Sequence, residues 1–200
     1  IIGDSTFQGC TNLTEVHLSA STQEIGEAAF AQCTALSNLE LPASLTTLGT
    51  AAFSHCSSLQ KIQIPDSVTV LNDSTFWSCS SLTTVQFPKN LKRIEASAFS
   101  ECTSLSHLEL PGTLTFIGEG AFSRCTSLQE LSMPDSITTL GTHSFSSCSA
   151  LKSVRISCRL SELPNSTFSS CTELTRVTIP DSIQSIGGSA FDECTSLMDV

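Results

Sequence analysis

Tyrosine is absent from this sequence of 200 residues, tryptophan occurs once, and only 14% of the residues are charged. Basic residues are scarce, with nine Lys and Arg against 19 Asp and Glu, so the formal net charge is −10. A protein that binds nucleic acid needs a basic surface that displaces counterions from the phosphates. We therefore expect no nucleic-acid partner, and this charge gives no attraction to an anionic membrane surface either.

Long apolar runs are missing too. No segment approaches the roughly 20 apolar residues that span a bilayer, so no membrane span is expected in this chain. No signal peptide is expected within these residues, because Ile1–Gly3 opens in the middle of a pattern that recurs downstream. The sequence stops inside the same pattern, at Leu197–Val200, so both ends are expected to be truncated and any targeting signal to lie beyond them.

What the sequence does contain is an internal period of 23 residues. Phe recurs nine times at this spacing, a Cys follows each Phe by three residues, and a Leu follows each Cys by three. The Phe positions are Phe7, Phe30, Phe53, Phe76, Phe99, Phe122, Phe145, Phe168 and Phe191. The Cys positions are Cys10, Cys33, Cys56, Cys79, Cys102, Cys125, Cys148, Cys171 and Cys194. Such regularity predicts stacked structural repeats.

Residues 94–116 illustrate how one repeat is expected to fold. The i, i+3, i+6 spacing of Phe99, Cys102 and Leu105 predicts one face of a short helical turn. Leu108 and Leu110 then alternate with polar residues, which predicts a half-buried strand that ends at the following proline. A second extended piece leads to a glycine, and the residue after this glycine position suits a helix N-cap. These predicted caps are Asp4, Glu27, Thr50, Glu119, Thr142 and Asn165.

One repeat cannot bury its apolar face alone, but stacked repeats can. The expected fold is therefore an α/β repeat solenoid. Its turns are expected to wind into a right-handed superhelix, with short parallel strands on one face and short helical turns on the other. A single domain of about nine repeats over residues 1–200 follows from the nine registers. Each buried Phe contributes roughly 1.5–3 kcal/mol, so the Phe ladder is predicted to be a main source of stability.

The step Phe-x-x-Cys-x-x-Leu, followed by a strand, a Pro-x-Ser turn and an Ile/Leu-Gly pair, resembles the BspA-like leucine-rich-repeat family over essentially the whole chain. The ordinary leucine-rich repeat has an Asn ladder where this pattern has Pro and Ser. The resemblance implies a surface-displayed adhesion or protein-binding protein of anaerobic bacteria or protists, some of which attach to host matrix proteins. Local irregularity without loss of register is expected where Pro or Gly is replaced, at Ser19, Asn72, Glu95, Ser157 and Pro164.

Ten cysteines suggest a disulfide or metal framework as one interpretation. However, a 23-residue spacing matches no zinc motif, and stacked positions present parallel Cβ vectors that suit a disulfide poorly. We therefore expect the nine repeated cysteines to form a buried ladder of reduced thiols. Cys158 lies outside this ladder, in the turn column of Asp66 and Asp135, and is expected to be more exposed, either as a reactive thiol or as a drifted turn residue.

No catalytic residue, metal ligand or cofactor site is expected. The histidines occupy different columns, and no zinc-binding, phosphate-binding or nucleophile motif is present. These histidines are His17, His55, His107 and His143. The Asn-x-Ser/Thr sequons at Asn12, Asn72 and Asn165 are expected by chance in a chain rich in Ser and Thr.

Partner contacts are expected on the exposed columns of the first strand, where a solenoid displays variable residues. One column contains His17, Glu40, Gln63, Gln86, Glu109, Ser132, Arg155 and Thr178. Its neighbour contains Glu15, Asn38, Lys61, Thr84, His107, Glu130, Ser153 and Arg176. These polar, mixed charges favour a protein or glycan partner, although a merely solvated face would have the same composition.

Outliers in other columns are further candidates. Trp77 and Phe116 replace small or polar residues, and exposed aromatic residues are enriched at binding hot spots. Single exposed apolar residues are also common on ordinary surfaces. A basic patch in two adjacent repeats of this acidic chain is predicted to receive an acidic partner; it comprises Lys152, Arg155, Arg159 and Arg176.

Three functions agree with these observations. The first is a non-catalytic binding module, secreted or on the cell surface, that serves adhesion or recognition through the strand face. The second is an intracellular or organellar scaffold subunit of a larger assembly, which suits reduced cysteines equally well. The third is the repeat region of a larger enzyme or receptor. The partner is expected to be another protein, such as a host matrix protein or an assembly subunit, or a glycan.

Overall fold

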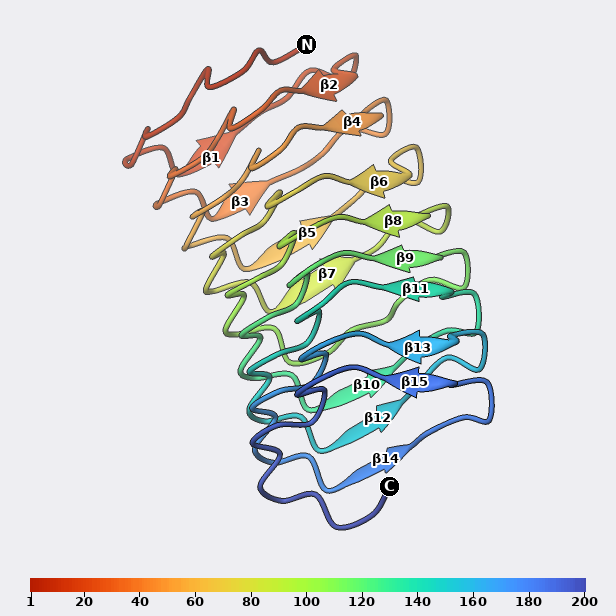
Figure 1. Cartoon of the computed structure of the whole chain (residues 1–200). Coiled ribbons are helices and arrows are strands. Elements are labelled where there is room, and N and C mark those ends of the chain that lie inside the picture. Colours follow the sequence, from red (N-terminus) through yellow and green to blue (C-terminus); the bar gives the residue numbers. More distant parts are fainter.

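The computed structural model describes all residues, 1–200, as a single stack of turns in which short parallel strands line two faces (Figure 1). The two termini lie at opposite ends of the stack (Figure 1). The first face carries β1 (Glu15–Val16), β3 (Asn38–Leu39), β5 (Lys61–Gln63), β7 (Thr84–Gln86), β10 (Glu130–Ser132), β12 (Ser153–Arg155) and β14 (Arg176–Thr178). The second face carries β2 (Glu24–Ile25), β4 (Thr47–Leu48), β6 (Val70–Leu71), β8 (Arg93–Ile94), β9 (Phe116–Ile117), β11 (Thr139–Leu140), β13 (Glu162–Leu163) and β15 (Ser185–Ile186).

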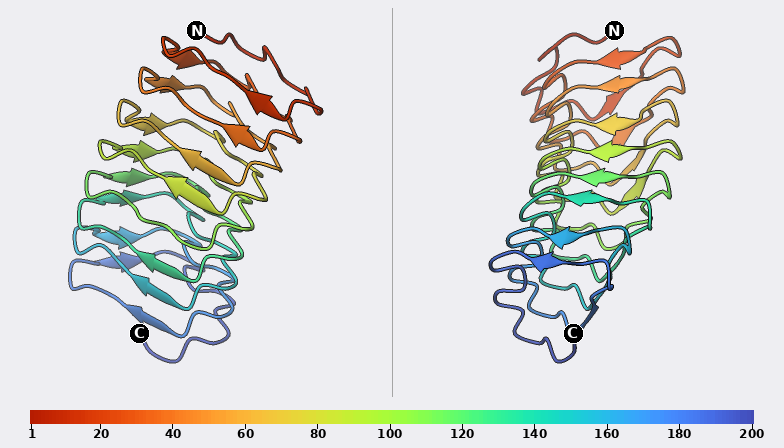
Figure 2. Two further views of the ribbon diagram at one scale, coloured as in Figure 1. Left: turned by 180° about the vertical axis from the view of Figure 1, so that it is seen from behind. Right: turned by 45° about the vertical axis from the view of Figure 1, so that its right-hand side comes forward.

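Paired strands are offset by one repeat, as the period predicts. Glu15 lies beside Asn38, Gln63 beside Gln86, and Arg155 beside Thr178, which is a step of 23 residues each time. The sheet on each face is nevertheless interrupted. The first face comprises β1-β3, β5-β7 and β10-β12-β14, and the second comprises β2-β4, β6-β8-β9-β11 and β13-β15. Figure 2 shows both faces turning gradually along the stack.

The predicted helical turns are wrong, because the chain contains no helix. Around Phe53, consecutive β-turns replace them: Ser54 donates its N–H to Ala51 and Cys56 donates to Phe53. Ala51 and His55 have φ of 53° and 58°, a region that non-glycine residues seldom occupy. This alternation points the N–H groups of Ala51, Phe53 and His55 along the stack, where they donate to carbonyls of the next repeat. A helix would instead consume these groups internally.

The predicted N-caps are wrong for the same reason. The side chains of Asp4 and Asn165 accept hydrogen bonds from the backbone N–H groups of Glu27 and Gly188 in the next repeat, both at 2.8 Å. These residues therefore join neighbouring turns, and no helix begins at them.

The predicted Phe and Cys ladders form the core. Adjacent Phe rings stack with centroids 5.1 to 5.7 Å apart along the whole chain. The eight ladder thiols from Cys33 to Cys194 each donate to the carbonyl of the Phe 26 residues earlier, as Cys79 does to Phe53 at 3.2 Å. All ten cysteines are unpaired, and seven ladder members are buried as predicted. The prediction is wrong for Cys10, which is exposed, and holds in part for Cys194, which is half-buried, because each lies in a terminal turn covered on one side only. The thiols therefore satisfy carbonyls between the stacked turns.

Two interruptions of the second face lie where a column of glycines is replaced. A Cβ at Gly49 would lie 2.4 Å from the carbonyl carbon of Gly26, so the close approach of successive turns requires glycine there. The sheet is broken where this column carries Asn72, between β4 and β6, and where it carries Pro164, between β11 and β13. Pro164 has no N–H, and at the other break the side chain of Asn72 donates to Leu48 at 2.7 Å. Glu95 leaves β6, β8 and β9 paired, so loss of the glycine alone does not break the sheet. Strands also pair in the repeats that carry Ser19 and Ser157, so the expected irregularity is found as a break in pairing only at Asn72 and Pro164.

The first strand predicted in residues 94–116 is also absent. His107 and Glu109 are exposed and Leu108 is buried, so the predicted alternation is present. However, no backbone hydrogen bond joins residues 106–110 to residues 83–87, and a strand requires such a ladder.

Candidate functional site

The first-face columns are exposed along their full length, as the sequence predicted. All sixteen residues of the two columns are exposed, while the residues between them, such as Ile62, Leu131 and Val154, are buried. In β5, for example, Lys61 and Gln63 face outward on either side of Ile62. This face is therefore a polar surface supported by a rigid apolar layer.

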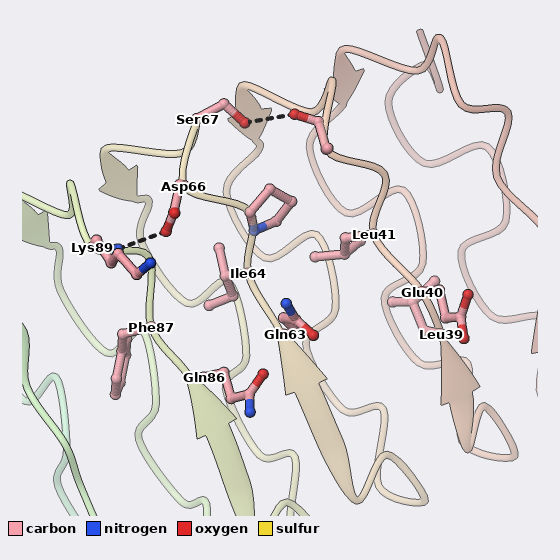
Figure 3. Close-up of a pocket in the computed structure, with 12 residues that line it drawn as sticks. Leu39, Glu40, Leu41, Gln63, Ile64, Asp66, Ser67, Gln86, Phe87 and Lys89 are labelled. Carbon is pink, nitrogen blue, oxygen red and sulfur yellow. Dashed lines mark hydrogen bonds between the residues drawn. The ribbon is translucent and has the colours of Figure 1, made fainter.

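The largest depression on this face lies at the carboxyl ends of β3, β5 and β7 and has a volume of about 790 Å³. We call it the central groove. Figure 3 shows Glu40, Gln63 and Gln86 in a row on these strands. Behind them, Leu41, Ile64 and Phe87 line the apolar side of the groove (Figure 3). The groove therefore combines polar groups that orient a ligand with an apolar surface that it can bury.

Turn residues form the rim of the central groove. The carboxylate of Asp66 accepts the backbone N–H of Lys89 at 2.8 Å, which holds two successive turns together. The hydroxyl of Ser67 donates to the carbonyls of Ala43, at 3.1 Å, and Leu45. These bonds use the side chains of the Pro-x-Ser turns to fix the rim.

Two further depressions extend the central groove along the face. One, of about 320 Å³, lies over β1 and β3 and shares Glu40 and Leu41 with it. The other, of about 510 Å³, lies between β7 and residues 106–109 and shares Gln86 and Phe87 with it. We call the latter the side groove. Phe87 therefore lies at the junction of the two grooves.

Sequence reasoning found the polar residues of this site and missed its apolar side. Leu41, Ile64 and Phe87 occupy the same column as Leu110, which the repeat predicts as the apolar side of the strand; Ile64 is buried, but Leu41 and Phe87 are half-buried. One signal was present: Phe87 is the one aromatic residue in a column of Leu, Ile and Met. Its half-buried ring packs edge-on against Phe99 at 5.6 Å.

Three of the four residues in the predicted basic patch form ion pairs with carboxylates of this chain. Arg155 contacts both carboxylate oxygens of Asp135 at 3.0 Å, and this hydrogen bonding lowers the pKa of the Asp135 carboxyl. Lys152 lies 3.9 Å from Glu173, and Arg176 lies 3.4 Å from Asp199. Arg159 is exposed. Binding of an acidic partner by this patch stays a prediction. Such a partner would compete with these carboxylates for the basic side chains.

The two aromatic outliers lie away from the grooves. Trp77 is 37% exposed on the turn side and contacts the ring of His55 edge-on at 4.6 Å. Phe116 belongs to β9 on the second face, where the guanidinium of Arg93 covers its ring at 3.8 Å. Neither residue joins the first-face columns in one site.

Burial raises the pKa of the ladder thiols, and that of Cys79 rises to about 12. Thiolate, the reactive form of cysteine, is therefore disfavoured throughout the buried ladder. Cys10 and Cys158 are exposed, and the backbone N–H of Cys158 lies 3.4 Å from the carboxylate of Asp135.

Other kinds of site have little support in the geometry. No three His, Cys, Asp or Glu side chains gather closely enough to share a metal ion. The structure also contains no helix with the length and hydrophobicity of a transmembrane span.

Comparison with known proteins assigns the repeat. A model of the BspA type leucine rich repeat region matches residues 1–126 and 92–200, with six copies. None of the curated proteins matches the chain.

Solved structures of bacterial leucine-rich-repeat proteins are similar in fold. A leucine-rich-repeat protein of T. pallidum has 29% identity and a TM-score of 0.75, over 88% of this chain and 78% of that one. A leucine-rich-repeat protein of Bacteroides ovatus has 30% identity and a TM-score of 0.67, over 100% of this chain and 64% of that one. A leucine-rich cell surface protein of Faecalibacterium prausnitzii has 26% identity and a TM-score of 0.52, over 100% and 76%.

Proposed function

From the premise that this chain belongs to the BspA-type leucine-rich-repeat family, we propose that it is a non-catalytic module that binds another protein through its first face. We further propose that it acts in adhesion or recognition at the cell surface or after secretion. The similar protein of Faecalibacterium prausnitzii is described as a cell surface protein, which supports this location.

The central groove is the observation that carries the proposal. It is the largest of the three adjoining depressions on the first face, and it lies within the columns where polar residues vary from repeat to repeat. Leu41, Ile64 and Phe87 give it an apolar surface beneath the polar row. Protein interfaces gain most of their affinity where such apolar contacts exclude water, and polar neighbours set specificity.

A matched pair of double variants tests the proposed face. Gln63→Arg with Gln86→Arg changes the first face, and Thr47→Arg with Thr139→Arg adds the same charge to exposed positions of β4 and β11 on the second face. Binding of each protein to a panel of purified extracellular-matrix proteins is measured by surface plasmon resonance.

The first-face variant is expected to lose affinity at least about tenfold, which corresponds to roughly 1.4 kcal/mol. The second-face variant is expected to bind like the wild-type chain. If only the second-face variant lost affinity, the proposed binding face would be wrong. No binding to any member of the panel would contradict the adhesion role.

A further inference from the structure

Residues Ser106–Leu110 form an open strand edge on the first face. They make one backbone hydrogen bond, in which Gln129 donates to the carbonyl of Ser106 at 3.4 Å. None of the five N–H groups in this segment has a partner within the chain. His107 and Glu109 are exposed, and their side chains contact each other at 3.3 Å. The segment therefore presents unpaired main-chain groups of the kind that template the addition of a strand.

The opposite wall of the side groove is β7, which is paired on one side alone. Its Gln86 carbonyl accepts the N–H of Ile64 from β5 at 3.0 Å, but no backbone bond reaches residues 106–110. Val85, the inward residue of β7, is half-buried, whereas the equivalent Ile62 and Leu131 are buried. The side groove of about 510 Å³ thus lies between two strand-like segments that do not pair with each other.

Acidic side chains outnumber basic ones along this half of the first face, and the side groove itself has one carboxylate, that of Glu109, and no Lys or Arg. The central and side grooves and their two neighbours are lined by five carboxylates and one lysine; these are Glu15, Glu40, Asp66, Glu109 and Glu130, with Lys89. Glu109 belongs to the open segment and lines the side groove, whereas Glu130 lines a smaller depression on the other side of the segment, beside β10. Complementary charge on a partner would be positive.

We propose that an extended, basic segment of a partner protein adds as a strand to Ser106–Leu110 in the side groove, beside Phe87. Main-chain hydrogen bonds to those N–H and C=O groups of the segment that face the groove, which belong to alternate residues of a strand, provide the pairing. The carboxylate of Glu109 and those of the adjoining grooves select Lys or Arg side chains. A glycan offers neither a regular main-chain ladder nor positive charge. This proposal rests on the proposed function, because it names the kind of partner that binds the same face.

Amide hydrogen exchange of the whole chain tests the pairing directly. The probes are the basic peptide KTVKVTK, its acidic counterpart ETVEVTE, and the basic peptide with alternate backbone nitrogens methylated. At a basic-peptide concentration of about ten times its Kd, exchange of residues 106–110 is expected to slow about tenfold, because mainly the unbound fraction exchanges. The acidic and methylated peptides are expected to give no protection, and the second face should not change.

Glu109→Lys is the matched charge test, with Glu162→Lys on β13 of the second face as its control. Both residues are exposed, so both variants are expected to fold like the wild-type chain, as circular dichroism can verify. Glu109→Lys should lower the affinity for the basic peptide about tenfold, and Glu162→Lys should leave this affinity unchanged.

Equal protection by the acidic or methylated peptide, or protection of 106–110 by a neutral oligosaccharide, would overturn strand addition. No protection by the basic peptide would also overturn it. The proposed function is judged separately. A matrix protein that loses affinity for the Gln63→Arg, Gln86→Arg variant, yet does not protect residues 106–110, would leave the binding face supported and strand addition rejected.

Discussion

The two halves of the first face use the same 23-residue pattern but present different surfaces. From β1 to residue 110 the strands are interrupted twice and the grooves between them are mainly acidic. From β10 to β14 three strands pair continuously, and the shallow depression over them has one Glu and two Arg in its lining. The comparison shows that one core supports both surfaces. In the open half the backbone itself is available to a ligand, and in the paired half only side chains are.

The largest expected effect concerns the core that both halves share. Phe99→Ala, beside the side groove, and Phe145→Ala, beneath the paired half, should each destabilise the protein by roughly 3–5 kcal/mol through loss of a buried ring and its stacking. Chemical denaturation measures both values. A much smaller loss for Phe99→Ala would mean that the open half has a looser core, and the two halves would then differ below the surface as well.

Alkaline pH should destabilise both halves through the buried thiols. The pKa of Cys79 rises from 9.0 to about 12 on folding, so between these values the unfolded chain loses a proton that the folded chain retains. The free energy of unfolding therefore falls as pH increases above 9, by up to roughly 1.4 kcal/mol per pH unit for each such thiol. Denaturation curves from pH 8 to 11 measure this slope. Cys79→Ala should make it shallower, and an unchanged slope would show that this thiol does not contribute.

Asn72→Gly should close the junction that is broken on both faces, between β3 and β5 and between β4 and β6. Glycine permits the close approach of turns seen at Gly49, and the backbone N–H of position 72 could then pair with Leu48. A gain of about 1 kcal/mol is expected for a restored strand pair, with slower amide exchange at position 72. If the exchange rate does not change, the opening has a cause elsewhere, such as the first-face strands themselves.

The smallest expected effect concerns the exposed ion pair between Arg155 and Asp135 in the paired half. Arg155→Glu removes the hydrogen bonds that hold the pKa of Asp135 below its usual value, so this pKa should rise, as NMR titration would show. In the wild-type chain the ion pair contributes above the ordinary carboxyl pKa of 3.8 and is lost as pH falls through the lower folded value. Binding of the basic peptide by the open half should not weaken. A weakened affinity would mean that the two halves act as one site.

Several features of the fold could be predicted from the sequence because they depend on repetition. A large apolar residue repeated every 23 positions must stack on its equivalents, so the buried Phe and Cys ladders and the exposed first-face columns follow directly. The helical turns could not be predicted correctly. Residues such as Phe99 and Cys102 are three apart, and this spacing suits a helix and a series of β-turns equally well. The positive φ of Glu101, which excludes the helix, follows from hydrogen bonding to the next repeat.

The grooves depend on still longer-range effects. The sequence predicts that Gln63 and Gln86 are exposed, because the 23-residue period places them in one polar column of the first strand. The opening beside Phe87 was missed, because it depends on which neighbouring strands fail to pair, and no single repeat encodes that outcome.

The sequence by itself thus determined the stacking unit, its core and the residues that face solvent, since each is a property of one position repeated along the chain. Only the tertiary structure decided where adjacent repeats pair and where they separate. This depends on how closely two backbones approach, which changes where the glycine is replaced by Asn72, and on the backbone N–H groups available, one of which is lost at Pro164. The open, acidic half of the first face is the result of those contacts between repeats.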